Sequence, residues 1–296
     1  MPDTINALLD RSTIVIPAKN EAKGLETLLP DLLKHAKGAR IIVVDDGSID
    51  GTADICETYG VKTIRHLHSK GNGASIKNGA RHADSEILIF MDADSQHDPK
   101  YIRPLLEQLA DGADMAIGAR NNGSQASLSR LAANNFYNLM ASWMVNEKVP
   151  DLTSGFRAVY RDKFLEFLDL LPNGFSYPTT ITIAFFRAGY TVAYVPIKAK
   201  KRLGKSHVDI KKDGIRFLLI IFKIGTLYSP LKVFFPVSAG IFSTGMFYYL
   251  YTFLTAGRFT NMSALLFTSS IIIFLMGLVA EQINNLQYSL LSKNKG

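Results

Sequence analysis

The segment Asp92-Ala93-Asp94-Ser95-Gln96 carries two carboxylates one residue apart. The apolar run 87–91 leads directly into it, which places the acids at the carboxyl end of a buried strand. Oxygen ligands at such a position can bind Mg²⁺ or Mn²⁺, and that cation would bridge the diphosphate of a nucleotide and neutralise charge on the leaving group. An Asp-x-Asp pair on its own is more often a solvated turn, so the assignment depends on its neighbours.

Two further strand ends carry acidic loops. The strand expected at 41–44 runs into Asp45-Asp46-Gly47-Ser48, and the strand at 13–17 runs into a turn from Pro17 to Glu21. Adjacent acids are costly unless a cation or a hydrogen-bond donor faces them. We expect Ser48 or Asp50 to cap the next helix while an aspartate points into the site. Three such loops in succession indicate one ligand site at the carboxyl edge of a sheet.

A glycine-rich segment, Lys70-Gly71-Asn72-Gly73, lies between these loops. Glycines allow a backbone to approach a ligand closely, and the lysine could meet a phosphate. The dinucleotide-binding pattern fails here, because Ile76 occupies the position of the third glycine. The chain also has no Walker-type phosphate loop.

The alternation of apolar runs predicts an α/β fold. We expect strands at 13–17, 41–44, 61–64, 87–91 and 115–117, and helices at 21–37, 52–59, 75–83 and 99–109. Strands alternating with helices predict a mostly parallel sheet covered by helices on both faces, of the Rossmann-like kind.

The last third of the chain is more apolar. Segments 232–254 and 263–280 are each about as long as the ~20 residues that a bilayer span requires. A buried core helix is the alternative, but two such segments with a short link favour a membrane hairpin. Segment 215–227 is expected to be an amphipathic helix at the membrane surface. We therefore expect three parts. Residues 1–209 form a catalytic domain, residues 210–230 form the amphipathic segment next to the membrane, and residues 231–296 form the two spans with a basic tail.

The net charge is +7, and basic residues gather just before the first span: Lys198, Lys200, Lys201, Arg202, Lys205, Lys211, Lys212 and Arg216. Such a cluster is typical of a cytoplasmic, lipid-phosphate-attracting flank. No nucleic-acid reader motif accompanies it. The single cysteine, Cys56, and a polar start without signal-peptide character also favour a catalytic domain on the cytoplasmic side.

The motifs PAKNEA, VDDGS, KGNGASIKNG and DADSQHDP, in this order, closely resemble family 2 glycosyltransferases with the GT-A fold. The segment Asp151-Leu152-Thr153-Ser154-Gly155-Phe156-Arg157, followed by two spans, is similar to the branch of dolichol-phosphate mannose synthase and bacterial polyprenyl-phosphate glucosyltransferases. The resemblance covers nearly the whole chain. It implies a hexosyltransferase that moves a sugar from a UDP- or GDP-linked donor to a polyprenyl phosphate in the membrane.

The resemblance also implies residue roles. On the donor side these are Pro17, Glu21, Asp45, Asp46, Lys70, Gly73, Asp92 and Ala93; Asp94 and Gln96 would hold the metal; and the acceptor phosphate would meet Arg120, Arg130, Ser154, Arg157 and Arg202. The catalytic set is Asp92, Asp94, Arg120 and Asp151, although Asp151 is expected to brace its loop at least as much as it acts chemically. A phosphate acceptor, with a second pKa of about 6, needs no strong protein base, and direct displacement inverts the anomeric carbon.

Two rivals remain at this stage. A polysaccharide synthase, or a transferase to another lipid, keeps the fold, but the Gln-x-x-Arg-Trp signature of the synthases is absent: the only tryptophan, Trp143, follows Ala141 and Ser142 and is expected to pack on a helix near the membrane. A non-catalytic membrane scaffold that binds nucleotides is disfavoured by the intact acid loop and Arg120. The sugar, the base and the lipid are not readable from the sequence, and a homo-oligomer through paired hairpins is an open expectation.

Overall fold

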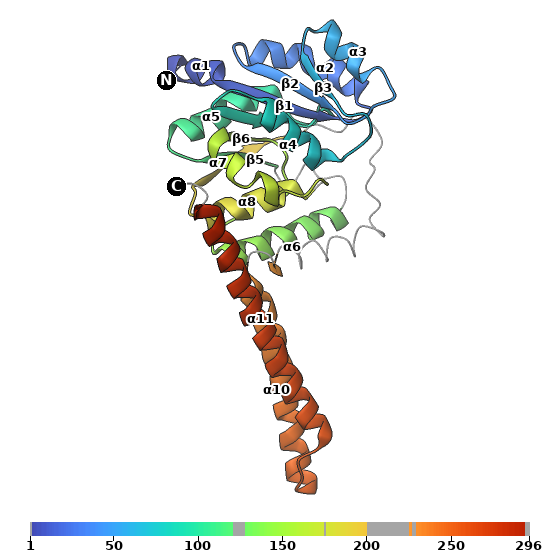
Figure 1. Ribbon diagram of the computed structural model, residues 1–296, viewed down its shortest axis with the longest axis vertical. Helices are drawn as coiled ribbons and strands as arrows, with labels where there is room; N and C mark the ends of the chain where they lie inside the picture. Colours follow the sequence, from blue (N-terminus) through green and yellow to red (C-terminus); the bar gives the residue numbers. More distant parts are fainter. Residues whose placement is uncertain (1, 121–127, 175, 200–224, 227–228, 294–296) are drawn as a thin grey trace. The chain divides into compact units, whose positions relative to one another are not determined.

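The computed structural model describes residues 2–120, 128–174, 176–199, 225–226 and 229–293 of the chain. Contacts divide the chain into two compact units, Met1–His207 and Val208–Gly296 (Figure 1). The expected amphipathic helix at 215–227 lies almost entirely outside the described residues.

The first unit is built on a seven-stranded sheet with strand order β3-β2-β1-β4-β6-β5-β7. Its strands are β1 (Ser12–Ala18), β2 (Arg40–Asp45), β3 (Lys62–Arg65), β4 (Ile87–Phe90), β5 (Met115–Arg120), β6 (Arg157–Tyr160) and β7 (Val192–Ile197). The five strands predicted from sequence are present, and β6 and β7 are additional. Only β6 runs antiparallel to its neighbours β4 and β5 among these strands. The start of β6 therefore lies at the same edge of the sheet as the ends of β4 and β5.

Helices cover both faces of the sheet, as predicted. The helices among the described residues of this unit are α1 (Pro2–Asp10), α2 (Ala22–His35), α3 (Thr52–Thr58), α4 (Asn72–His82), η1 (Pro99–Tyr101), α5 (Ile102–Ala110), α6 (Leu128–Val145), α7 (Arg161–Glu166), η3 (Leu168–Leu170) and α8 (Tyr177–Arg187). Ile14 and Ile16 share one buried cluster with leucines of α2 and α5. Val15, which points to the opposite face, lies against Gly79 of α4. This alternation is the period of two that a strand buried on both sides produces.

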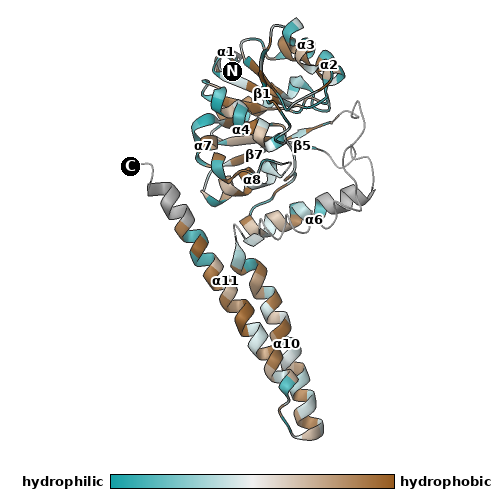
Figure 2. Cartoon of the chain, turned by 45° about the vertical axis from the view of Figure 1, so that its right-hand side comes forward, coloured by the Kyte–Doolittle hydropathy of each residue, from teal (hydrophilic) through white to brown (hydrophobic). Residues whose placement is uncertain are grey.

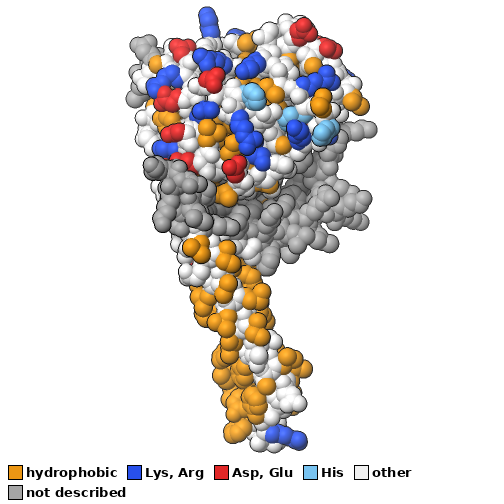
Figure 3. Space-filling view, viewed as in Figure 1, with side chains coloured by type: hydrophobic (Ala, Val, Ile, Leu, Met, Phe, Trp, Pro, Cys, Tyr) orange, Lys and Arg blue, Asp and Glu red, His pale blue; other side chains and the backbone are white. Residues whose placement is uncertain are grey.

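The second unit contains a helical hairpin of α10 (Pro230–Ala256) and α11 (Asn261–Lys293). Ser238 and Ser270 bond reciprocally across it, each hydroxyl donating to the other's backbone carbonyl at 2.9 and 3.0 Å. Both helices are long and apolar enough to cross a membrane, and only 11% and 17% of their apolar stretches are buried. Hydrophobic residues predominate along both helices (Figure 2), and many hydrophobic side chains are exposed on the face seen in Figure 3. This low burial argues against the alternative of core helices, because a core helix would be mostly buried.

Candidate active site

The first two loops at the carboxyl edge of the sheet are fastened to each other. Asn20, in the left-handed region with φ of 53°, donates its backbone N–H to Ser48 Oγ at 2.9 Å and accepts from Ile49 N–H at 2.9 Å. Asp50 accepts from the backbone N–H groups of Thr52 at 3.1 Å and Ala22 at 3.2 Å. Asp50 thus bonds the starts of α3 and α2 together. The N-cap of α3 itself is Gly51, so Asp50 lies one residue before the capping position and accepts from the first helical residue, Thr52.

Asp46 organises the loop at 66–71, which is expected on the donor side. Its two carboxylate oxygens accept four hydrogen bonds: from His66 Nδ1 at 2.7 Å, Ser69 Oγ at 2.7 Å, and the backbone N–H groups of Lys70 at 2.8 Å and Gly71 at 2.9 Å. Burial acts to raise the pKa of Asp46, but the bonds from His66, Ser69 and the two backbone groups lower it to about 2. The carboxylate therefore fixes the segment 66–71 in place.

The other residues expected on the donor side differ in their exposure to solvent. Pro17 is buried in β1 opposite Val44. Asp45 is also buried, and it accepts from Ser48 N–H at 2.8 Å and pairs with Arg65 at 3.3 Å. Glu21 is half-buried at the start of α2, and Lys70 is exposed. Gly73 packs so closely on the following loop that an added Cβ would lie 2.1 Å from the carbonyl oxygen of Pro172.

The acid loop after β4 is held in a tight turn. Ser95 has a left-handed φ of 58°, and its hydroxyl donates to Gly24 O of α2 at 2.8 Å. Asp94, 8% exposed, accepts the backbone N–H of Gln96 at 3.1 Å. The turn therefore places the Asp94 carboxylate beside the backbone of Gln96, and Ala93, between the two acids, is buried.

These residues fit a hard divalent cation. Carboxylate and amide oxygens are its preferred ligands. Among the described residues, no group of three or more His, Cys, Asp or Glu side chains could hold a metal by itself. This donor set suits a cation that keeps water and takes phosphate oxygens as further ligands, as Mg²⁺ usually does.

The antiparallel strand β6 brings the second half of the site against Asp92. Phe90 pairs with Arg157, so continuing the ladder two residues outward places Asp92 opposite Gly155. The contact is close: a Cβ on Gly155 would lie 3.0 Å from a carboxylate oxygen of Asp92. The loop that enters β6 can approach the acid loop in this way because residue 155 has no side chain.

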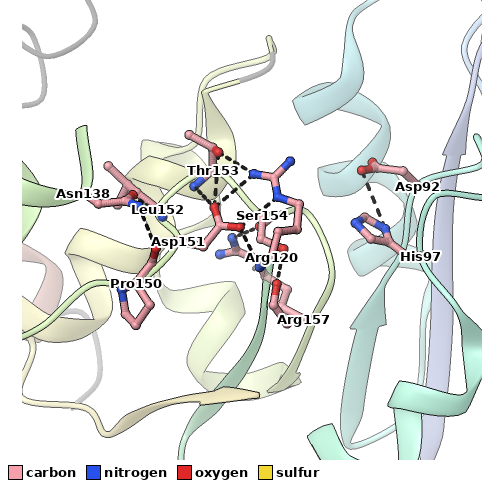
Figure 4. A network of polar contacts seen from close by, with 11 residues as sticks. Asp92, His97, Arg120, Asn138, Pro150, Asp151, Leu152, Thr153, Ser154 and Arg157 are labelled. Atoms are coloured by element: carbon pink, nitrogen blue, oxygen red, sulfur yellow. Dashed lines mark hydrogen bonds and ion pairs between the residues drawn. The ribbon is translucent and has the colours of Figure 1, made fainter. Parts of the chain in front are cut away.

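Arg120, the last residue of β5, is fixed by Asp151 (Figure 4). Its Nε and Nη2 donate to Asp151 Oδ2 and Oδ1 at 2.8 and 3.0 Å, and Nη2 also donates to Thr153 Oγ1 at 2.7 Å. Burial acts to lower the pKa of Arg120, but the hydrogen bond and charge of Asp151, together with the charges of Asp92 and Asp94, raise it. Against its own burial, Asp151 has a lowered pKa because of Arg120. Asp151 is thus the brace of Arg120.

Ser154 and Arg157, expected at the acceptor phosphate, are fully buried and bonded within the protein. Ser154 Oγ donates to Gly118 O at 2.6 Å. Arg157 donates to Ser154 O, to Pro178 O at 3.3 Å and to Thr182 Oγ1 at 3.2 Å. Both side chains therefore join the site loop to β5 and α8, and we do not keep them as phosphate ligands. The side chains of Arg130 and Arg202 lie outside the described residues.

Three residues had no role from sequence alone. His66 links Asp46 to Asn78 of α4, whose amide lies 2.9 Å from His66 Nε2. Thr153 bonds Arg120. His97, immediately after Gln96, is buried, and burial lowers its pKa to about 4, opposed by Asp94. The only sequence signal for Thr153 and His97 is their position beside acidic motifs, and for His66 it is its position just before the glycine-rich segment.

Comparisons with known proteins identify the family of the chain. The sequence model of glycosyl transferase family 2 matches residues 13–168, and that of the GtrB C-terminal hairpin matches residues 229–286. The polyprenol monophosphomannose synthase of Mycolicibacterium smegmatis is 30% identical over 72% of this chain and 85% of its own length. A dolichyl-phosphate hexose transferase of Haloferax volcanii is 28% identical over 68% of this chain and 87% of its own.

A solved structure gives the fold. Glucosyl-3-phosphoglycerate synthase from Mycobacterium tuberculosis, crystallised with Mg²⁺ and UDP, superposes with a TM-score of 0.60 at 20% identity, covering 75% of this chain and 82% of that one. The catalytic unit is thus a GT-A glycosyltransferase domain. The chain belongs to glycosyl transferase family 2, and its C-terminal hairpin marks it as a membrane protein.

Proposed function

We propose that the chain transfers a hexose from a UDP- or GDP-linked sugar to a polyprenyl phosphate, with inversion at the anomeric carbon. The observation that carries the proposal is the Arg120–Asp151 pair at the edge of the sheet that also holds the acid loop. Relatives named for polyprenol and dolichyl phosphate acceptors support the lipid. The product would be a lipid-linked monosaccharide for later glycan modification.

The donor would lie over the loops of β1, β2 and β4. Asp94 and Gln96 would hold Mg²⁺ or Mn²⁺, which when bound neutralises charge on the departing nucleoside diphosphate. Asp46 keeps the loop at 66–71 in shape for the nucleoside, and Asp92, against Gly155, faces the sugar side of the donor. In this proposal the protein contributes alignment and fixed charge, without a strong base.

The acceptor phosphate would bind at Arg120. Asp151 and Thr153 engage Nε and Nη2, and no bond of Nη1 is formed by the residues that the structure describes. A guanidinium held on one side by a carboxylate presents its remaining N–H groups in a fixed direction. The acceptor oxygen attacks the anomeric carbon, the bond from that carbon to the diphosphate breaks, and the nucleoside diphosphate leaves with the electron pair.

Helix α6 supports a lipid-borne acceptor. Phe136, Leu139 and Trp143 are 52%, 69% and 46% exposed, and their spacing of three and four residues puts them on one helical face. No charged residue occurs between 131 and 146. An exposed apolar face containing tryptophan suits the interface of a bilayer, and the hairpin of the same chain keeps a bilayer close.

The same helix is bonded to the loop that holds Arg120. Asn138 of α6 donates to Pro150 O at 2.6 Å and accepts from Leu152 N–H at 3.0 Å, so it grips the residues on either side of Asp151. We infer that α6 lies on the lipid surface and holds Arg120 at headgroup depth. The catalytic unit would face the cytoplasm, as the basic segment before α10 favours.

The test is transfer by the purified chain in lipid nanodiscs. UDP- and GDP-linked radiolabelled hexoses are each supplied with Mg²⁺ or Mn²⁺ and undecaprenyl phosphate, and label is measured in the organic phase. We expect one donor to label the lipid. Asp94→Ala should abolish transfer, whereas Asp169→Ala, at a residue whose side chain is 95% exposed, should not. Failure of all donors, or normal turnover by Asp94→Ala, would refute the proposal.

A further inference from the structure

His97 is a buried polar side chain, and one of its ring nitrogens has no hydrogen-bond partner among the described residues. It is 4% exposed. Its Nδ1 atom is buried and makes no hydrogen bond with any residue that the structure describes. Buried polar atoms without a partner are rare in native proteins, and one beside an acid loop calls for a role that the protein's own contacts do not supply.

Two contacts of His97 join the proposed donor and acceptor halves of the site. Its ring stacks on Phe156, with ring centroids 5.1 Å apart and planes inclined by 18°. Its Nδ1 lies 3.9 Å from Asp92 Oδ2 (Figure 4). That distance is about 1 Å too long for a hydrogen bond. Phe156 directly follows Gly155, the residue that packs on the Asp92 carboxylate. The imidazole and the glycine therefore both lie against the same carboxylate.

A small movement would complete the bond. The stack on Phe156 fixes the plane of the ring, and Gly155 limits where the Asp92 carboxylate can go. A rotation of the Asp92 side chain by a small angle would bring its oxygen within reach of Nδ1–H, and hydrogen bonds in catalytic sites often tighten in this way only when a ligand binds. The remaining charged groups around His97 are Asp94, Arg120 and Asp151, and the last two are bonded to each other.

We propose that His97 is a positioning residue for the donor: with a nucleotide-sugar bound, its Nδ1–H bonds to Asp92 Oδ2 and sets the direction of that carboxylate. The inference rests on the proposed function for the part that Asp92 plays toward the donor. His97 itself touches no reacting atom. Loss of a partner that orients a site residue typically costs about 10- to 100-fold in affinity or activity.

Three substitutions separate the hydrogen bond from the packing. His97→Phe keeps a flat ring on Phe156 but has no N–H. His97→Asn loses most of the stack but can place an amide N–H near the position of Nδ1. His97→Gln moves that amide one carbon further out. The measurements are the Kd of the nucleotide-sugar with Mn²⁺ by calorimetry, donor and acceptor KM, kcat, and Tm.

We expect His97→Phe to lose about 10- to 100-fold in donor kcat/KM or affinity, with an unchanged acceptor KM and a Tm near that of the wild type. His97→Asn should recover most of the loss, and His97→Gln should not. In an Asp92→Asn background, His97→Phe should cause little further loss, because the bond is already changed.

Several results would overturn the inference. They are wild-type behaviour of His97→Phe, equal losses in His97→Phe and His97→Asn, a loss confined to acceptor KM, or full additivity with Asp92→Asn. If His97→Phe does not fold, the difference between His97→Asn and His97→Gln decides the same question. Donor affinity needs no acceptor, so failure of lipid transfer by the wild type would sink the proposed function while the calorimetry still judges His97.

Discussion

The Asp151→Asn variant tests whether the Arg120 pair shapes the acceptor site. The Asp151 side chain is 7% exposed and that of Arg120 26%, so the substitution leaves a largely buried guanidinium facing a neutral amide. Breaking a fully buried pair costs about 3–5 kcal/mol. Asparagine keeps one acceptor oxygen, and Arg120 has some solvent, so we expect about 2 kcal/mol. For a domain of this size that corresponds to a fall in Tm of about 4–8 °C.

The kinetic effect should be confined to the acceptor. Because Asp151→Asn removes the partner that orients Arg120, the acceptor KM should rise by about 10-fold or more. This is the free-energy equivalent of one charge-assisted hydrogen bond. The donor KM should stay constant, because Asp151 bonds Arg120 and Thr153, which the proposed function places on the acceptor side. Initial rates at saturating donor and varied polyprenyl phosphate, with Tm followed by the fluorescence of Trp143, measure both quantities.

A matched control lies at the other end of the same strand. Asp114, just before β5, pairs with Lys163 and accepts from Thr191 N–H. Asp114→Asn should also lower Tm but leave the acceptor KM unchanged. The reasoning fails if Asp151→Asn keeps the wild-type Tm and acceptor KM, or if Asp114→Asn shifts the acceptor KM as strongly.

Three further predictions concern the loop, the membrane and the orientation. The pKa of Asp46 is about 2 against an ordinary 3.8, so the stability that the Asp46 carboxylate adds to the fold is complete above about pH 4 and is lost as the pH falls through 2. The difference in Tm between Asp46→Asn and the wild type should therefore shrink by roughly half between pH 6 and pH 3. A constant difference would contradict the lowered pKa of Asp46. Trp143 is the only tryptophan, so bromolipids in nanodiscs should quench its fluorescence strongly; quenching no greater than by aqueous bromide would remove α6 from the bilayer surface. Cys56 is fully buried, so it should not react with a thiol reagent and interfere with labelling of introduced cysteines. In intact cells, an impermeant maleimide should label Phe259→Cys, in the link of the hairpin, and should not label Leu67→Cys in the catalytic unit. The reverse pattern would place the catalytic unit outside the cell.

The sequence predicted those parts of the fold where burial and local pattern agree. Strands β1, β2 and β4 are uninterrupted apolar runs that end in turn residues, and α2 shows its leucines at helical spacing. Helix α8 was missed because its segment Thr179-Thr180-Ile181-Thr182-Ile183 is β-branched and typical of a strand. The structure makes it a helix buried on nearly every side, where packing outweighs a propensity difference of under ~1 kcal/mol per residue.

The site was predictable to the level of its loops and less so for individual side chains. The acid motifs predict where ligands bind, because polar residues that directly follow buried parallel strands lie at the edge of the sheet where such folds take their ligands. Residue type does not reveal whether a guanidinium faces a ligand or the core. Arg120 and Arg157 read alike in the sequence, yet Arg157 is wholly buried against α8. The tertiary partner decides the role, and for Arg157 that partner lies 21 residues further along the chain.

The reversed direction of β6 has an evolutionary consequence. In the proposed function, residues 13–97 supply the donor-side loops as one continuous stretch, and the acceptor-side residues Arg120, Asp151 and Thr153 lie between the end of β5 and the start of β6. Recognition of the acceptor thus lies in one exchangeable segment, apart from the segment that would recognise the nucleotide. Swapping that segment between relatives should redirect the sugar to a different recipient while leaving the choice of donor intact, so long as a glycine remains opposite Asp92.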